Sequence, residues 1–189
     1  TFDLPPAVTA ASAMNALAHC VEALWVPECT PVMAAAAMES IFRFSGFLGR
    51  AVADGGDAEA RSQCLIAAWL AGTALLAGGG LQHKLAHILG GYGLPHAETH
   101  AIVLPHVTRF NLAAAPGAQA RLCSALATDD PAGALAALLA GFPIPRRLRD
   151  VGFTEDKFDD AAAQVAALQL AHPRPVSLAE AHAVIAAAF

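Results

Sequence analysis

Five of the eight histidines of this 189-residue chain lie in one short segment, residues 80–106. They are His83, His87, His96, His100 and His106. An imidazole can ligate a metal ion and can transfer a proton near neutral pH. A single histidine in an apolar helix is usually a hydrogen-bonded core residue, but five within one segment favour a functional site.

The spacing of these histidines predicts which of them share a surface. His83 and His87 are four residues apart in a segment that is expected to be helical, and so are His96 and His100. Residues four apart project from the same side of a helix. The two pairs can therefore face one cavity, provided that the two segments pack together.

Two further polar residues share a helix face near the start of the chain. Asn15 and His19 are four residues apart, separate from the apolar stripe of that helix. With His83 and His96 they would make a four-point site that accepts iron or zinc, and such a cation would act as a Lewis acid. Asn15 is the weakest of the four ligands, because a neutral amide binds a hard cation less well than a carboxylate.

Other polar residues have both a functional and an ordinary interpretation. Lys84 and Arg174 are candidate partners for a substrate carboxylate. Glu98 either orients one imidazole or is a first-turn acid favoured by the helix dipole. The glycines at 78–80 and 90–91 match neither phosphate-binding pattern and are interpreted as helix punctuation.

The composition favours an all-α fold with one domain. Hydrophobic residues make up 56% of the chain, but aromatic residues only 6%, so much of the apolar content is alanine, a strong helix former. The net charge is −5 and the basic residues are scattered, which argues against nucleic acid or an anionic membrane as a partner.

Hydrophobic periodicity and capping residues predict the helices that position the candidate site. Thr30, Asp57, Thr154 and Ser177 are expected N-caps, and either Asp129 or Asp130 caps another helix. The helix 97–111 contains Pro105, which is expected to kink it. The expected helices are 7–25, 31–53, 58–77, 81–89, 97–111, 117–128, 131–139, 145–150, 155–170 and 178–188.

One helix is expected to be central in the bundle. The stretch 64–76 is apolar nearly all round, which indicates burial on most sides. Residues 64–81 are uncharged and form the only candidate membrane span, but their glycine content and length favour a buried helix. The four cysteines show no C-x-x-C pair and no secretory signal precedes them, so we expect reduced core thiols in a cytoplasmic protein.

Three long motifs resemble the maleylacetate reductases, a branch of the iron-containing (group III) alcohol dehydrogenase superfamily. They are N-A-L-A-H-C-V-E-A-L-W at 15–25, R-S-Q-C-L-I-A-A-W-L-A-G-T-A-L at 61–75, and the histidine-rich segment 83–106. The resemblance implies that residues 1–189 form the helical C-terminal domain of the dehydroquinate synthase-like type. It also implies that the family's N-terminal α/β domain, which binds the nicotinamide cofactor, is absent from this chain.

The resemblance further implies a reaction. Such an enzyme reduces 2-maleylacetate to 3-oxoadipate with NADH or NADPH in the degradation of aromatic compounds, and a homodimer is expected. Asn15, His19 and Lys84 would then bind the dicarboxylate substrate. The catalytic residues would be His83, His87, His96 and His100, of which His87 or His100 donates the proton.

The chain departs from the family pattern at two places. The family's metal ligands correspond to Asn15, His19, His83 and His96, and Asn15 stands where metal-dependent relatives have aspartate. The loop between His87 and His96 is one residue shorter than expected, which could move His96 away from His83. Two alternatives therefore stay open: half of an iron- or zinc-dependent alcohol dehydrogenase, or a non-catalytic helical module that assembles with a separate nucleotide-binding chain.

Overall fold

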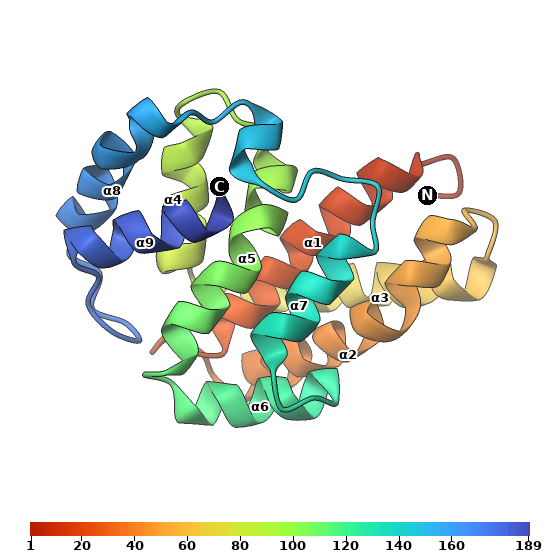
Figure 1. Cartoon of the computed structure of the whole chain (residues 1–189). Helices are drawn as coiled ribbons and strands as arrows, with labels where there is room; N and C mark the ends of the chain where they lie inside the picture. Colours follow the sequence, from red (N-terminus) through yellow and green to blue (C-terminus); the bar gives the residue numbers. More distant parts are fainter.

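The computed structural model describes residues 1–189 and is built from helices without any strand, which confirms the all-α prediction (Figure 1). Most helices begin and end within a few residues of the expected positions. The expected helix 155–170 is split into a 3-10 turn and a shorter α-helix, and 145–150 is replaced by another 3-10 turn. The elements are α1 (Pro6–Ala23), α2 (Pro31–Ala53), α3 (Ala58–Leu75), α4 (Leu81–Gly90), α5 (His96–Leu112), α6 (Pro116–Leu126), α7 (Pro131–Ala140), η1 (Leu148–Val151), η2 (Glu155–Lys157), α8 (Phe158–Ala167) and α9 (Leu178–Ala188).

Side-chain caps fix several helix starts where the sequence predicts them. Thr30, Asp57 and Asp130 each accept a hydrogen bond from a backbone N–H in the first turn of their helix. Ser177 and Glu180 form a complete capping box at α9. Thr154 was expected to cap a helix but makes no side-chain cap, because a 3-10 turn precedes α8.

Helix α5 runs through the middle of the molecule between two apolar cores (Figure 1). Ala101 and Leu104 face the core formed mainly by α1, α2 and α3. Ile102 and Val103 face the second core, formed with α4, α8 and α9. The helix continues through Pro105, and both of its faces are covered, so α5 is the central helix of the fold.

The prediction that 64–76 forms the central helix is wrong. Within this stretch of α3 only Ala67, Ala71 and Ala74 are buried, whereas Trp69 and Leu76 are 74% and 72% exposed. The small side chains let α3 approach α2 closely, as the hydrogen bond from Ser40 Oγ to the Ala67 carbonyl (2.8 Å) shows. An apolar residue on either face looks the same in a hydrophobicity pattern, so periodicity could not separate the packed face from the exposed one.

No single helix is long and apolar enough to cross a membrane, and this includes the expected candidate in α3. Helices α6 and α7 reach that length and composition only as a pair, and the pair is bent by 46°.

All four cysteines are free thiols. Only Cys20 is a core residue, and burial raises its pKa to about 12; the other three cysteines are partly exposed.

Candidate active site

Five histidines from three helices form one group, which we call the histidine cluster: His19, His83, His87, His96 and His100. His19 comes from α1, the next two from α4 and the last two from α5. The ring centroids of His19 and His83 are 3.9 Å apart, and His100 lies 4.6 Å from both His83 and His96. The cluster borders a cavity of about 250 Å³ lined by His19, Leu75, Gly78, Gly79, His83, Lys84, His87 and His96.

His106 is not a member of the cluster. It lies six residues after His100 on α5, beside Arg109 and Phe110 in a separate hollow against α9. Burial, together with the charge of Arg109, lowers the pKa of His106. The histidine-rich segment therefore contains one histidine that lies outside the cluster, whereas His19, which the sequence analysis named from the first helix, lies in it.

The turn between α3 and α4 brings the cluster close to α1. Gly78 has φ +87°, a conformation that side chains other than glycine rarely adopt. A methyl group added at Gly79 would lie 3.0 Å from His83 Cβ, and one at Gly80 would lie 3.2 Å from Glu22 Oε1. These glycines therefore do more than end a helix, because they leave room for Glu22 and His83.

Glu22 is a buried carboxylate at the edge of the cluster. Its side chain is fully buried, and its two oxygens accept hydrogen bonds from the backbone N–H groups of Gln82 (2.7 Å) and His83 (3.3 Å). Glu22 Oε2 also lies 2.5 Å from His83 Nδ1. Sequence reasoning missed this residue, although it is the only acid in the first helix and lies three residues after His19.

His19 and His83 meet through their Nε2 atoms, which are 3.2 Å apart. Burial, and then the neighbouring His83, His96 and His87, lower the pKa of His19 to about 4. His19 is therefore neutral near pH 7. Its Nδ1 is buried without a hydrogen-bond partner, as is Oδ1 of Asn15 one turn earlier on α1.

His100 lies at the buried end of the cluster. The Gln82 side-chain amide donates to the His100 carbonyl (3.0 Å) and lies 3.5 Å from His100 Nδ1, whereas His100 Nε2 has no partner. Burial, followed by the charges of His83 and the other cluster histidines, lowers the pKa of His100 to about 2. A neutral ring is therefore held at this position. Sequence reasoning also missed Gln82.

His87 and His96 lie at the exposed end of the cluster, with Lys84 beside them at the cavity wall. Burial and the neighbouring His83, His96 and Lys84 lower the pKa of His87. One ring nitrogen each from His87, His96 and His100 lie within 4.8 Å of one another, which is close enough to share a cation. The structure thus pairs His19 with His83, and it groups His96 with His87 and His100.

The remaining candidates lie outside the cluster. Glu98 sits in the first turn of α5, as the helix-dipole interpretation expects, and makes no hydrogen bond to an imidazole. Arg174 forms an ion pair with Glu180, and its guanidinium lies 4.5 Å from the centre of the Phe110 ring. Neither residue lines the cavity beside the cluster.

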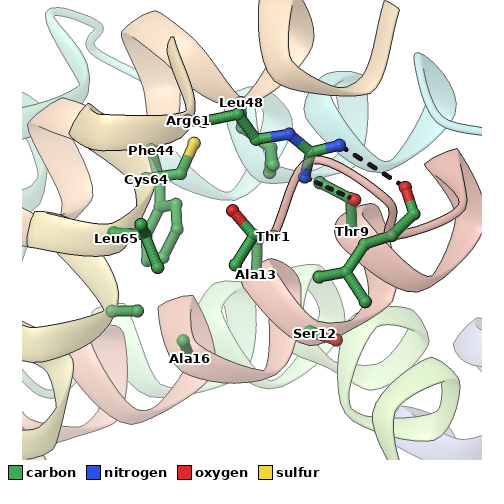
Figure 2. A pocket seen from close by; sticks show the side chains of 12 residues that line it. Thr1, Thr9, Ser12, Ala13, Ala16, Phe44, Leu48, Arg61, Cys64 and Leu65 are labelled. Atoms are coloured by element: carbon green, nitrogen blue, oxygen red, sulfur yellow. Dashed lines mark hydrogen bonds between the residues drawn. The ribbon is translucent and has the colours of Figure 1, made fainter. Parts of the chain in front are cut away.

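A second cavity, of about 160 Å³, lies between α1, α2 and α3 and is mostly apolar (Figure 2). At its edge the buried Arg61 donates to Thr9 Oγ1 (2.8 Å) and to the carbonyls of Leu4 (3.4 Å) and Gly55 (3.1 Å). No histidine or acid lines this cavity, and the guanidinium is occupied by internal contacts (Figure 2). The group suited to chemistry is therefore the histidine cluster.

Comparisons with known proteins agree with the fold and with the family that the sequence motifs resemble. Residues 9–189 match the family model described as the Fe-containing alcohol dehydrogenase family, C-terminal. The chain is 44% identical over 191 residues to maleylacetate reductase 2 of Cupriavidus pinatubonensis, covering 98% of this chain and 53% of the relative. It is 41% identical over 186 residues to maleylacetate reductase of Pseudomonas sp. strain P51, covering 97% and 52%.

A solved relative has the same architecture. The crystal structure of maleylacetate reductase from Agrobacterium tumefaciens superimposes with a TM-score of 0.96 at 35% identity, covering 100% of this chain and 54% of that one. The chain thus spans about half the length of the relatives it matches.

Proposed function

The chain belongs to the iron-containing alcohol dehydrogenase family, whose C-terminal part it matches, and from this membership we propose that it supplies the histidine-lined half of a maleylacetate reductase active site. The reaction would be the NADH- or NADPH-dependent reduction of 2-maleylacetate to 3-oxoadipate. The observation that carries the proposal is the convergence of four histidines and Lys84 on one cavity, with His100 buried behind them, in a chain 41–44% identical to maleylacetate reductases.

The cavity suits a dianionic substrate. None of its lining residues is acidic, and Lys84 places an ammonium group at the wall beside His87 and His96. Glu22 is nearby, but both of its oxygens are taken up by α4. A substrate carboxylate would therefore meet a cation and imidazole N–H groups without a competing negative charge.

The cluster also suits the charge that reduction of an enone develops. A nicotinamide held by the partner domain would supply the hydride, and negative charge would then develop on the ketone oxygen. His19 and His83 meet at their Nε2 atoms beside the cavity, where a proton or a metal ion held by these atoms would stabilise such charge. We assign proton delivery to His87 instead of His100, because His87 is exposed and can exchange protons with solvent whereas His100 is fully buried.

A divalent metal fits part of this site. The Nε2 atoms of His19 and His83 converge to 3.2 Å, and Oδ1 of Asn15 is buried without a partner, as expected of groups that ligate one ion. Asn15, His19 and His83 would hold iron or zinc, which would supply a Lewis acid for the ketone oxygen, whereas His96, the fourth expected ligand, is grouped with His87 and His100. The neutral amide of Asn15 makes this binding weaker than in a site with a carboxylate ligand.

The partners follow from the same proposal. A nicotinamide-binding domain would pack over the cavity and complete the site, since the relatives are about twice as long as this chain. A homodimer stays a prediction from the resemblance, and a cytoplasmic location stays a prediction from the cysteine pattern.

The proposal is tested by following NADH and NADPH oxidation with 2-maleylacetate in the complete polypeptide that carries these residues. We expect turnover that falls at least 10-fold when His83 or His87 is replaced by alanine. Unchanged turnover and substrate affinity in both variants would exclude the assigned roles. Turnover of simple aldehydes without turnover of maleylacetate would exclude 2-maleylacetate as the substrate.

The alternative of a metal-dependent alcohol dehydrogenase is favoured by one observation, the ring nitrogens of His87, His96 and His100 within 4.8 Å of one another. Metal analysis of protein purified without chelator distinguishes a metal-dependent alcohol dehydrogenase from a maleylacetate reductase. Stoichiometric iron or zinc, with activity that is lost on chelation, would support the alcohol dehydrogenase.

A further inference from the structure

Helix α4 begins without a capping side chain from its own segment. Its N-cap is Gly80, which has no side chain to accept the free N–H groups of the first turn. Glu22, from α1, takes this role instead and accepts from the N–H groups of Gln82 and His83. The helix dipole favours a carboxylate at this end, and the fully buried Glu22 side chain lies there.

The same carboxylate determines which nitrogen of His83 carries hydrogen. Glu22 Oε2 lies 2.5 Å from His83 Nδ1. An ionised carboxylate can only accept hydrogen bonds, so Nδ1 must donate. In the neutral ring Nε2 is then left with a lone pair, and this atom is the one that lies 3.2 Å from His19 Nε2.

We propose that Glu22 is a positioning residue that caps α4 and holds His83 in the Nδ1–H tautomer, so that His83 Nε2 is the acceptor in the histidine cluster. The catalytic part of this inference rests on the proposed function; the tautomer does not. Glu22 also supplies a buried negative charge next to the cluster. This charge takes the place of the one that an aspartate at position 15 would supply. A cation brought to His83 Nε2, whether a proton or a metal ion, is stabilised by it.

The neighbouring glycines support this assignment. Methyl groups added at Gly79 and Gly80 would lie 3.4 Å from Glu22 Oε2 and 3.2 Å from Glu22 Oε1, respectively. The α3–α4 turn is therefore shaped around the carboxylate, which leaves Glu22 little freedom to release His83.

The test compares Glu22→Gln and Glu22→Asp in the complete polypeptide, with Glu180→Gln as the matched control. Glu180 also caps a helix, but it lies at α9, away from the cluster. A glutamine at position 22 can turn its amide NH₂ toward His83 Nδ1 and so force hydrogen onto Nε2. We expect Glu22→Gln to lower kcat about 10- to 100-fold with a much smaller change in KM. A rise in KM with unchanged kcat would overturn the positioning role.

A direct readout is the tautomer itself, measured by ¹⁵N NMR of histidine-labelled protein without substrate, with His83 assigned by a His83→Asn variant. We expect Nδ1–H at His83 in the wild type and in Glu180→Gln, and Nε2–H in Glu22→Gln. An Nε2–H signal in the wild type, or an unchanged tautomer in Glu22→Gln, would overturn the inference.

The two proposals can fail separately. If the wild type does not reduce maleylacetate, the proposed function fails, while the NMR experiment still decides the tautomer. If Glu22→Gln does not fold, Glu22→Asp is measured instead. Its carboxylate is expected to keep Nδ1–H with an intermediate kcat, and the Nε2–H form in this variant would overturn the inference.

Discussion

The Nε2 atoms of His19 and His83 lie 3.2 Å apart although the residues are 64 positions apart in the chain. Two ring nitrogens at this distance either form a hydrogen bond, in which one nitrogen is the N–H donor and the other the acceptor, or bind one metal ion together. Glu22 lies on the far side of His83, so a carboxylate and two imidazoles form one chain of contacts that ends at the cavity. The predictions below concern this chain of contacts and the elements that hold it.

Asn15→Asp should increase the affinity for zinc or iron, because it adds an anionic oxygen next to His19. Wild-type protein should keep most of its activity after chelation, since its only ligand beside the imidazoles is a neutral amide. The metal content of the purified proteins and a Zn²⁺ titration measure the affinity. Gln119→Glu makes the same chemical change on the exposed surface of α6 and should leave the affinity unchanged. Equal affinity in wild type and Asn15→Asp would argue against a metal position at Asn15.

Lys84→Gln should raise KM for the dicarboxylate about 10-fold, the effect of losing roughly 1.4 kcal/mol of carboxylate binding, with a smaller change in kcat. Lys84→Arg should recover part of the affinity. Lys157, the only other lysine, lies over the Tyr92 ring outside the cavity, so Lys157→Gln serves as the control. Steady-state kinetics would contradict the assignment if both glutamine variants behaved alike.

The stability of the fold should decrease as the pH falls from about 7 toward 4. Burial lowers the pKa of His19 to about 4 and that of His100 to about 2 from the ordinary 6.5. Below pH 6.5 the unfolded chain therefore binds protons that the native rings do not. Each histidine can lower the free energy of unfolding by up to roughly 1.4 kcal/mol per pH unit in that range.

Urea unfolding at pH 7, 6 and 5 measures this dependence. His100→Asn should flatten it, because the substitution removes one titrating group, whereas the exposed His172→Asn should not. A pH dependence that is the same in all three proteins would show that His100 takes up its proton equally in the folded and unfolded states.

Gly80→Ala should destabilise the fold by about 1–3 kcal/mol, as overpacking of a tight site does. The added methyl group would lie 3.2 Å from Glu22 Oε1. Gly46, in the interior of α2, has open space around its Cα, so Gly46→Ala should stabilise by about 0.5–1 kcal/mol. Thermal and urea unfolding measure whether each substitution stabilises or destabilises the protein. An unchanged free energy of unfolding in Gly80→Ala would mean that Glu22 can move away from the added methyl group.

Ala71→Leu should destabilise the protein by about 1–3 kcal/mol, because Ala71 is 4% exposed on the packed face of α3. Trp69→Ala, on the opposite face, should change the free energy of unfolding by less than about 0.5 kcal/mol, since Trp69 is 74% exposed. If the tryptophan variant were the more destabilised of the two, the exposed face of α3 would have to be packed in solution.

The sequence predicted most of what is local. The caps at Thr30, Asp57 and Ser177 fix helix starts, because a side-chain oxygen within a few residues satisfies the free N–H groups. The four-residue spacing of His83 and His87 places both on one side of α4. The three motifs indicated the family, and the comparisons confirm it.

Tertiary structure alone decided how the local pieces meet. Helical periodicity determines which side chains share a face, but it carries no information about which two helices pack together. The contact of His19 with His83, the capping of α4 by Glu22 and the exclusion of His106 all depend on the packing of α1, α4 and α5. For the same reason α3, apolar on both faces, was expected at the centre, while packing placed α5 there and left Trp69 exposed.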